Sequence, residues 1–204
     1  MIVSKLEEAF RFISRFALLN LTWLGYTVIG AVIWGLFPST FALFTTVHRW
    51  IRQDTESPIV RPFHQTFKGY FWKANLVGWI LTGIGSLLYL NYHLISSSGG
   101  AVPLPVTISF LMMIIIYTLV IVSLFPAWVY YEGGIKNAFL QSFRFVFGRI
   151  HVAVGFAIIV WGSLYLSLAF PAVLLFFTGS LLAYILMWFF NRTIYKLQLK
   201  ANLI

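Results

Sequence analysis

The chain has no cysteine and very little acidic charge. Of its 204 residues only five are Asp or Glu, against 14 Lys or Arg, and charged residues make up 9% of the sequence. Soluble domains carry about 25% charged residues, so this composition excludes a water-soluble fold and with it a nucleic-acid-binding domain. The absence of cysteine excludes disulfides, thiolate catalysis and thiolate metal sites.

The chain instead contains long runs of apolar residues. Hydrophobic residues make up 60% of it, and the mean hydropathy is +0.89. All charged residues fall into four blocks, and the stretches between the blocks contain no Asp, Glu, Lys or Arg. The blocks are Lys5–Arg15, Arg49–Lys73, Glu132–Arg149 and Arg192–Lys200, and the uncharged stretches are Phe16–His48, Ala74–Tyr131 and Ile150–Asn191. A charge at the bilayer centre costs roughly 2.5–3.5 kcal/mol, so these stretches are typical of membrane spans.

The second and third uncharged stretches are each long enough for two crossings, because one helix needs about 20 residues to span the hydrocarbon. The third stretch divides near Pro171 into spans over Ile150–Ala169 and Ala172–Asn191. The second divides at a Ser-Gly run and a proline pair into spans over Ala74–Ile95 and Val106–Tyr131. Each stretch is therefore predicted to form a hairpin.

The first stretch is short for two full crossings. The sequence Pro-Ser-Thr at 38–40 predicts a break, with Ser39 or Thr40 as a helix cap. We expect Phe16–Phe37 to cross and a shorter Ser39–Trp50 to return, tilted, packed inside the bundle or re-entrant. Cytoplasmic loops are enriched in Lys and Arg, and all four blocks contain these residues, so each stretch is expected to return to the cytoplasmic side. The prediction is an all-α bundle of about six transmembrane helices in a cell membrane, with both termini cytoplasmic; the alternative is five spans with an external amino terminus.

An internal repeat supports this sidedness. Two copies of the pattern E-x-x-I-x-x-x-F-x-Q-[ST]-F-[KR]-x-x-F-x-[KR] begin at Glu56 and Glu132. A repeat in the same orientation places both basic segments on one side of the membrane. The chain is thus predicted to be one transmembrane domain over 1–204, made of an interfacial helix (1–15), a first hairpin (16–50), repeat one (56–131), and repeat two with a basic tail (132–204).

Each repeat is predicted to open with an amphipathic helix that lies in the membrane interface, as is the amino terminus. Apolar side chains recur at helical spacing beside basic ones, and that composition is typical of interfacial helices. Such helices serve either as anchors on an anionic inner leaflet or as a docking surface for a partner. The residues predicted to contact lipid or a partner are Phe63, Phe67, Lys68, Phe71, Lys73, Phe139, Phe143, Arg144, Phe147 and Arg149.

The sequence contains few residues that could carry out catalysis or bind an ion. No acidic or basic residue lies inside a predicted span, whereas membrane enzymes and ion-coupled transporters usually carry such residues at their working sites. The sequence therefore predicts no catalytic residue, no metal site and no cofactor. Glu132 and its repeat partner Glu56 are interpreted as structural residues. Four side chains are candidates for the polar lining of a solute path: Asn20, Asn75, Asn91 and His93.

Several motifs resemble the YesL-like family of small bacterial multi-pass membrane proteins of unknown function. They are L-L-N-L-T-W-L at Leu18–Leu24, P-S-T-F-A-L-F at Pro38–Phe44, F-H-Q-T-F-K-G-Y-F-W-K-A at Phe63–Ala74, and G-I-K-N-A-F-L-Q-S-F-R at Gly134–Arg144. Members of that family tend to be encoded beside carbohydrate-uptake ABC transporters, sensor kinases and polysaccharide-degrading enzymes. The family has no agreed catalytic residues.

The resemblance implies a non-enzymatic accessory or stabilising subunit of an oligosaccharide ABC transporter, in contact with the permease subunits. Two alternatives stay open: a transporter or channel for a small solute, and a membrane partner of a sensor kinase. A water-accessible central cavity that bears the four polar candidates would favour transport. An interior packed with Phe, Leu and Ile would favour the accessory role.

Overall fold

A computed structural model gives the structure of residues 2–52, 58–99 and 102–201, and within these ranges every regular element is a helix. The elements are α1 (Ile2–Ile29), α2 (Leu36–Ile51), α3 (Val60–Ser97), α4 (Leu104–Tyr131), α5 (Ile135–Gly148), α6 (Ile150–Ala169), α7 (Pro171–Val173), the π-helical turn η1 (Leu174–Thr178) and α8 (Gly179–Ala201). The predicted all-α membrane bundle is therefore confirmed.

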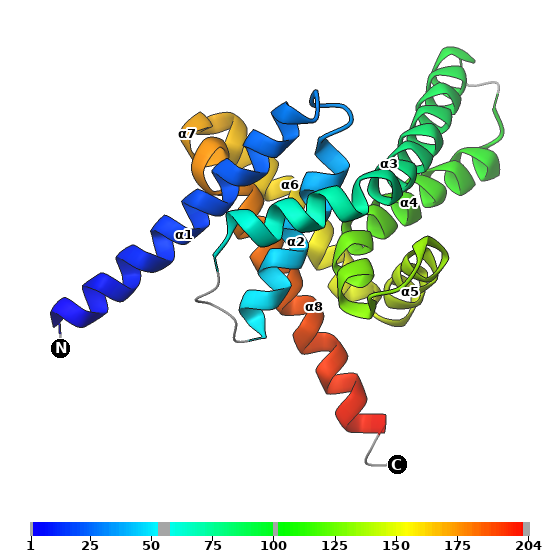
Figure 1. Cartoon of the computed structure of the whole chain (residues 1–204). Coiled ribbons are helices and arrows are strands. Elements are labelled where there is room, and N and C mark those ends of the chain that lie inside the picture. Colours follow the sequence, from blue (N-terminus) through cyan, green and yellow to red (C-terminus); the bar gives the residue numbers. More distant parts are fainter. Residues whose placement is uncertain (1, 53–57, 100–101, 202–204) are drawn as a thin grey trace.

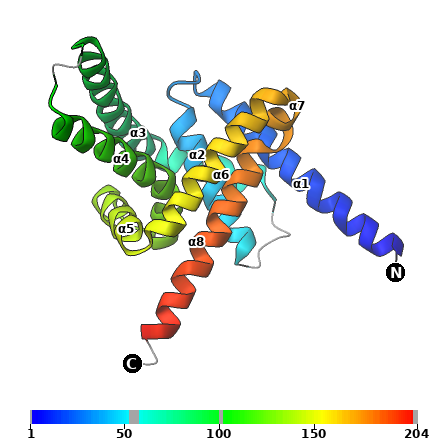
Figure 2. The same ribbon diagram turned by 180° about the vertical axis from the view of Figure 1, so that it is seen from behind.

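The chain ends and the turns between helices lie toward opposite ends of the molecule, although α3 first runs across the view before it turns upward (Figure 1). In both Figure 1 and Figure 2 the two termini lie toward the lower edge, while the turns after α1, α3 and α6 lie toward the upper edge. Ring contacts join the segments next to the charged blocks: the Arg15 guanidinium lies 5.3 Å from the centre of the Trp50 ring, and the Tyr130 ring lies 5.8 Å from the His48 ring and 5.6 Å from the Phe190 ring. The charged segments thus share one end of the bundle.

Among the residues that the structure describes, five helices are long and apolar enough to cross a membrane. They cover Phe10–Ile29, Val60–Ser97, Leu104–Tyr131, Ile150–Ala169 and Pro171–Gln198. The two long uncharged stretches form the predicted hairpins, α3 with α4 and α6 with α8, and the predicted span Ile150–Ala169 coincides with α6. The chain is accordingly a multi-pass membrane protein.

The first hairpin turns earlier than the sequence suggested. Its turn lies at residues 30–35, and Pro38 and Ser39 belong to the first turn of α2. A Cβ atom on Gly30 would overlap the Cα of Gly35, so these two glycines let the chain double back closely. Proline is tolerated in a first helical turn because its missing N–H has no partner there. Pro38 therefore marks the start of the helix, and the predicted break is corrected to the glycine pair.

Helix α2 is short and lies in the centre of the bundle (Figure 1). Its 16 residues rise only about 24 Å, and it is not one of the five helices long enough to span. Ten of the 16 are buried, with α1, α3, α4 and α8 packed around it. This matches the predicted shorter returning helix packed inside the bundle.

The predicted interfacial helices are only partly separate. Residues 2–15 continue directly into the rest of α1, and the basic segment of repeat one continues into the transmembrane part of α3. In repeat two the chain breaks, because α5 ends at Gly148 and Arg149 leaves helical geometry with φ −144° and ψ 50°. Gly148 stands where repeat one has Trp72, and glycine costs about 1 kcal/mol in a helix interior. All three predicted amphipathic segments are helical, and α5 is the one among them that forms a helix of its own.

Candidate functional site

Asn20, one of the polar candidates, is buried against the π-helical turn. Its Nδ2 donates to the carbonyl oxygens of Leu174 at 2.9 Å and Leu175 at 2.7 Å, and its Oδ1 accepts the backbone N–H of Ser180 at 3.0 Å. A π-turn disturbs the usual helical hydrogen bonds, and here the amide of Asn20 binds the displaced groups. Asn20 therefore joins α1 to η1 and to the start of α8.

Asn75 has a similar structural role on α3. It is buried, and its Nδ2 donates to the Trp34 carbonyl at 2.9 Å and to the Phe71 carbonyl at 3.0 Å. Trp34 belongs to the turn of the first hairpin, so Asn75 ties that turn to α3. Both polar atoms of the Asn20 amide and the Nδ2 of Asn75 are thus bonded to backbone groups, whereas the buried Oδ1 of Asn75 has no partner among the described residues.

The other two candidates lie near the far end of α3. Asn91 and His93 are both exposed, and the Asn91 Nδ2 donates to the carbonyl of Leu87 in its own helix at 2.9 Å. More than four helical turns separate Asn75 from Asn91, which corresponds to about 24 Å of helix rise. The four side chains therefore do not converge on one cavity.

The predicted contact surface of repeat one is mostly covered by protein. Phe63 and Phe67 are buried, and their rings lie 5.2 and 5.1 Å from that of Tyr26 in α1. Phe71 is half-buried, while Lys68 and Lys73 are exposed. The two buried phenylalanines are therefore core residues, which corrects their prediction as partner contacts.

The equivalent surface of repeat two is open. On α5, Phe143, Arg144 and Phe147 are exposed, Phe147 to 65%. Phe139 and Arg149 are half-buried. The Phe143 and Phe147 rings stack 6.4 Å apart. Helix α5 thus carries an aromatic and basic strip that no other described part of the chain covers.

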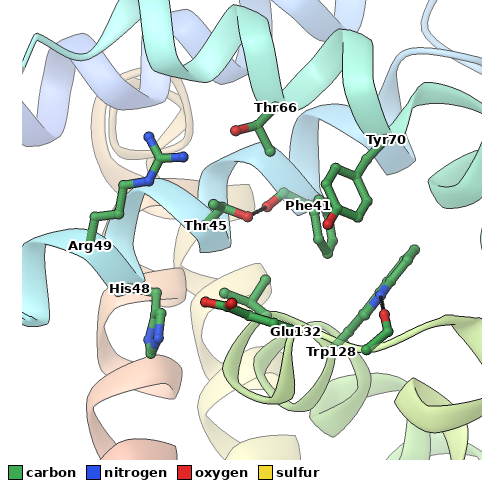
Figure 3. A pocket seen from close by; sticks show the side chains of 10 residues that line it. Phe41, Thr45, His48, Arg49, Thr66, Tyr70, Trp128 and Glu132 are labelled. Atoms are coloured by element: carbon green, nitrogen blue, oxygen red, sulfur yellow. Dashed lines mark hydrogen bonds between the residues drawn. The ribbon is translucent and has the colours of Figure 1, made fainter.

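A pocket that the sequence did not predict lies at the charged end of the bundle. It encloses about 300 Å³ between α2, α3, the end of α4 and the turn before α5, and we name it the α2–α4 pocket (Figure 3). Its lining residues are Phe41, Thr45, His48, Arg49, Thr66, Tyr70, Trp128, Val129, Glu132 and Gly133. Among them are a guanidinium, a carboxylate, an imidazole, two threonine hydroxyls and three aromatic side chains.

The aromatic residues of the pocket hold three helices together. The Phe41 ring stacks on that of Tyr70 at 4.4 Å and lies 4.5 Å from that of Trp128. The Trp128 Nε1 donates to the carbonyl of Gly133 at 3.0 Å, which closes the turn that follows α4. The pocket therefore has a rigid apolar wall.

Glu132, for which the sequence predicted a structural role, ends α4 in an unusual backbone conformation. Its φ of 46° and ψ of 37° lie in the left-handed region, which glycine or asparagine usually occupies at this position. Strained residues of this kind concentrate at functional sites. The conformation places the carboxylate in the pocket (Figure 3). Its repeat partner Glu56 lies outside the described residues.

His48 forms part of the same wall and is 5% exposed. Neither ring nitrogen has a hydrogen-bond partner among the described residues, and such a buried unpaired polar group costs about 1–3 kcal/mol. His48 lies on α2, outside the five spanning helices. Burial, and second the nearby Arg52 guanidinium, lower the pKa of His48 to about 4.

This lowered pKa predicts that acid destabilises the fold through His48. An unfolded chain takes up a proton near pH 6.5, whereas the folded chain resists it until about pH 4, so stability is full above pH 6.5 and falls as the pH drops toward 4. At pH 5 the expected loss is about 2 kcal/mol. Thermal unfolding in detergent between pH 7.5 and 5 measures it. His48→Gln should unfold with a clearly weaker pH dependence; an unchanged pH dependence would contradict the assignment to His48.

Comparison with known proteins gives a family and several relatives. The family described as "Protein of unknown function, DUF624" matches residues 16–92. The chain is 30% identical over 174 residues to "Uncharacterized protein YesL" of Bacillus subtilis (strain 168), which covers 85% of this chain and 82% of the relative. It is 29% identical over 194 residues to YteU (93% and 83% covered) and 29% over 186 residues to YesV (90% and 88% covered), both from the same organism. No solved structure matches the chain.

Proposed function

Because the chain belongs to the YesL-like DUF624 family, as its motifs predicted, we propose a function for it from its own geometry. It is a non-enzymatic accessory subunit that binds and stabilises the permease of a carbohydrate ABC transporter in the bacterial cell membrane. Both termini lie in the cytoplasm, and the charged end of the bundle rests against the anionic inner leaflet.

One observation carries the proposal: the polar residues proposed to line a solute path do not converge on one cavity. Asn20 and Asn75 bind backbone groups inside the bundle, and the core around them is filled by large apolar side chains such as Leu19, Val77 and Met187. This packing favours a protein that acts through its surface over one that conducts a solute through its centre.

Helix α5 supplies a suitable surface. Its exposed Phe143 and Phe147 lie beside Arg144, at the end of the bundle that carries the charged segments. Aromatic and Arg side chains are enriched among the residues that dominate binding at protein interfaces. In the proposed complex this strip packs against a cytoplasmic-side helix of the permease.

Co-purification tests the proposal. A tagged chain extracted in mild detergent from its native membrane should recover permease subunits, and the double variant Phe143→Ser/Phe147→Ser should reduce that recovery several-fold because it removes the aromatic contacts. Trp161→Ser, which changes an equally exposed aromatic residue on α6 (66% exposed), is the matched control and should recover the permease normally. Recovery of no permease subunit by the unmodified chain would refute the accessory role.

A further inference from the structure

The α2–α4 pocket has the features of a ligand site, and its two charges indicate which ligand. Arg49 from α2 and Glu132 from the turn before α5 both line it. In Figure 3 the guanidinium of Arg49 extends toward α3, while the carboxylate of Glu132 comes from the opposite side. Within the described part of the chain these two groups form no ion pair with each other. We propose that the pocket binds a small zwitterion, with a cationic nitrogen toward Glu132 and an anionic phosphate or carboxylate toward Arg49.

The hydroxyl groups of the pocket fit the cationic end of such a ligand. Thr45 donates its proton to the Phe41 carbonyl at 2.8 Å, and Thr66 donates its proton to the Pro62 carbonyl at 3.0 Å. Each hydroxyl oxygen therefore has only lone pairs to offer. Together with the Glu132 carboxylate they make three acceptors in one pocket, which suits an ammonium group with several N–H donors.

The aromatic wall favours the same group. Trp128 lines the pocket, and aromatic faces attract cations through their quadrupole; the Tyr70 ring in the same wall already has the Lys73 ammonium 5.5 Å from its centre. A simple anion gains nothing from three acceptors and an aromatic wall, and a simple cation gains nothing from Arg49. A ligand with both charges uses all of these groups.

His48 lines the pocket beside Glu132 (Figure 3). Its side chain is nine-tenths or more buried, and both ring nitrogens are without a partner among the described residues. A neutral imidazole both donates and accepts a hydrogen bond. Both ring nitrogens are covered by protein, so a ligand in the pocket reaches them only after the imidazole turns toward it.

Two sources have this chemistry: the headgroup of phosphatidylethanolamine, and a free molecule such as phosphoethanolamine. The volume of about 300 Å³ is at the small end of ligand pockets and accommodates either. The site stands apart from the accessory role, because none of its lining residues belongs to the exposed strip on α5.

The test uses the purified full-length chain in a detergent solution that contains no phospholipid and no phosphoethanolamine. Phosphatidylethanolamine or phosphoethanolamine, or both, should raise the unfolding temperature in a saturable way, and which of them does so identifies the source. Phosphatidylglycerol, inorganic phosphate and ethanolamine, each at the same concentration, should raise it far less. An equal effect of phosphatidylglycerol or phosphate means a site for anions only, and no effect of either zwitterion means no such site; both results overturn the proposal.

Charge-removing variants localise the effect. Glu132→Gln and Arg49→Gln should each weaken the apparent affinity at least tenfold, while Lys136→Gln, which removes an exposed charge on α5 outside the pocket, should leave it unchanged. Arg49 and Glu132 are both exposed, so the unliganded variants should unfold near the temperature of the unmodified chain. If one variant is destabilised, the affinity of the other variant tests the assignment. Undiminished affinity in the folded variants would also overturn the assignment.

Discussion

Replacement of Gly78 by alanine should lower the unfolding free energy by about 2 kcal/mol, because overpacking of a well-packed interior costs typically 1–3 kcal/mol. The Phe37 ring at the start of α2 lies directly on the Cα of Gly78 in α3, and an added Cβ would overlap three ring carbons. The two helices have little freedom to separate. The stacked Phe41 and Tyr70 rings hold them on one side, and the hydrogen bond from Asn75 to the Trp34 carbonyl holds them on the other.

Thermal unfolding in detergent measures this effect as a fall of about 4–8 °C. Gly83→Ala is the matched control, since Gly83 lies in the same helix and a Cβ there meets no atom within 4 Å. That variant should be neutral or slightly more stable, because alanine favours helix by about 1 kcal/mol over glycine. Phe37→Leu should restore part of the stability that Gly78→Ala loses. Equal effects of the two alanine substitutions would show that the close contact with Phe37 does not determine the stability of the Gly78→Ala variant.

Removal of the Asn20 amide should destabilise the bundle to a similar degree. Asn20→Ala leaves the carbonyls of Leu174 and Leu175 and the N–H of Ser180 without their partner. Hydrogen bonds between helices in membranes are worth only about 0.6 kcal/mol on average. A larger loss, of about 2 kcal/mol, is expected here because several buried groups are orphaned at once, each at a cost of about 1–3 kcal/mol.

The matched control is Asn91→Ala. Asn91 is exposed and donates only to the Leu87 carbonyl of its own helix, so its loss should change the unfolding temperature by less than about 1 °C. A direct comparison of the two variants by thermal unfolding separates the tertiary role of one asparagine from the local role of the other. If Asn20→Ala unfolds like Asn91→Ala, the hydrogen bonds to η1 do not stabilise the fold.

The membrane architecture was predictable because the exclusion of charge from the bilayer is a strong and local constraint. The uncharged stretches and their Gly and Pro interruptions located the hairpin of α6 and α8 and the hairpin of α3 and α4. The first hairpin was placed less well. Pro38 indicated a break, although proline also starts helices, while the two glycines that make the turn, Gly30 and Gly35, stand in sequence without charge or proline to mark them.

The surfaces and the pocket were harder to predict, because helical spacing shows that a helix has an apolar stripe but not what covers it. The stripes of the two repeats look alike in sequence, yet Tyr26 covers Phe67, while Phe143 remains open. To predict the α2–α4 pocket, one would have to know contacts between residues that are far apart in the sequence. Thr45 lies on α2 and Trp128 on α4, far apart in the sequence, and no local pattern brings them together. The left-handed backbone of Glu132 likewise leaves no mark in the sequence.

The central position of α2 has a consequence for the order in which the protein is made. Helices α1 and α2 leave the ribosome first, yet α8, which packs against α2, is synthesised last. Until then the polar Ser39 and His48, both buried in the finished fold, have no completed surroundings and face lipid or the insertion machinery. A chain that stops before α8 lacks one of the helices that pack around α2. We therefore expect a truncated product of this kind to be degraded by membrane proteases.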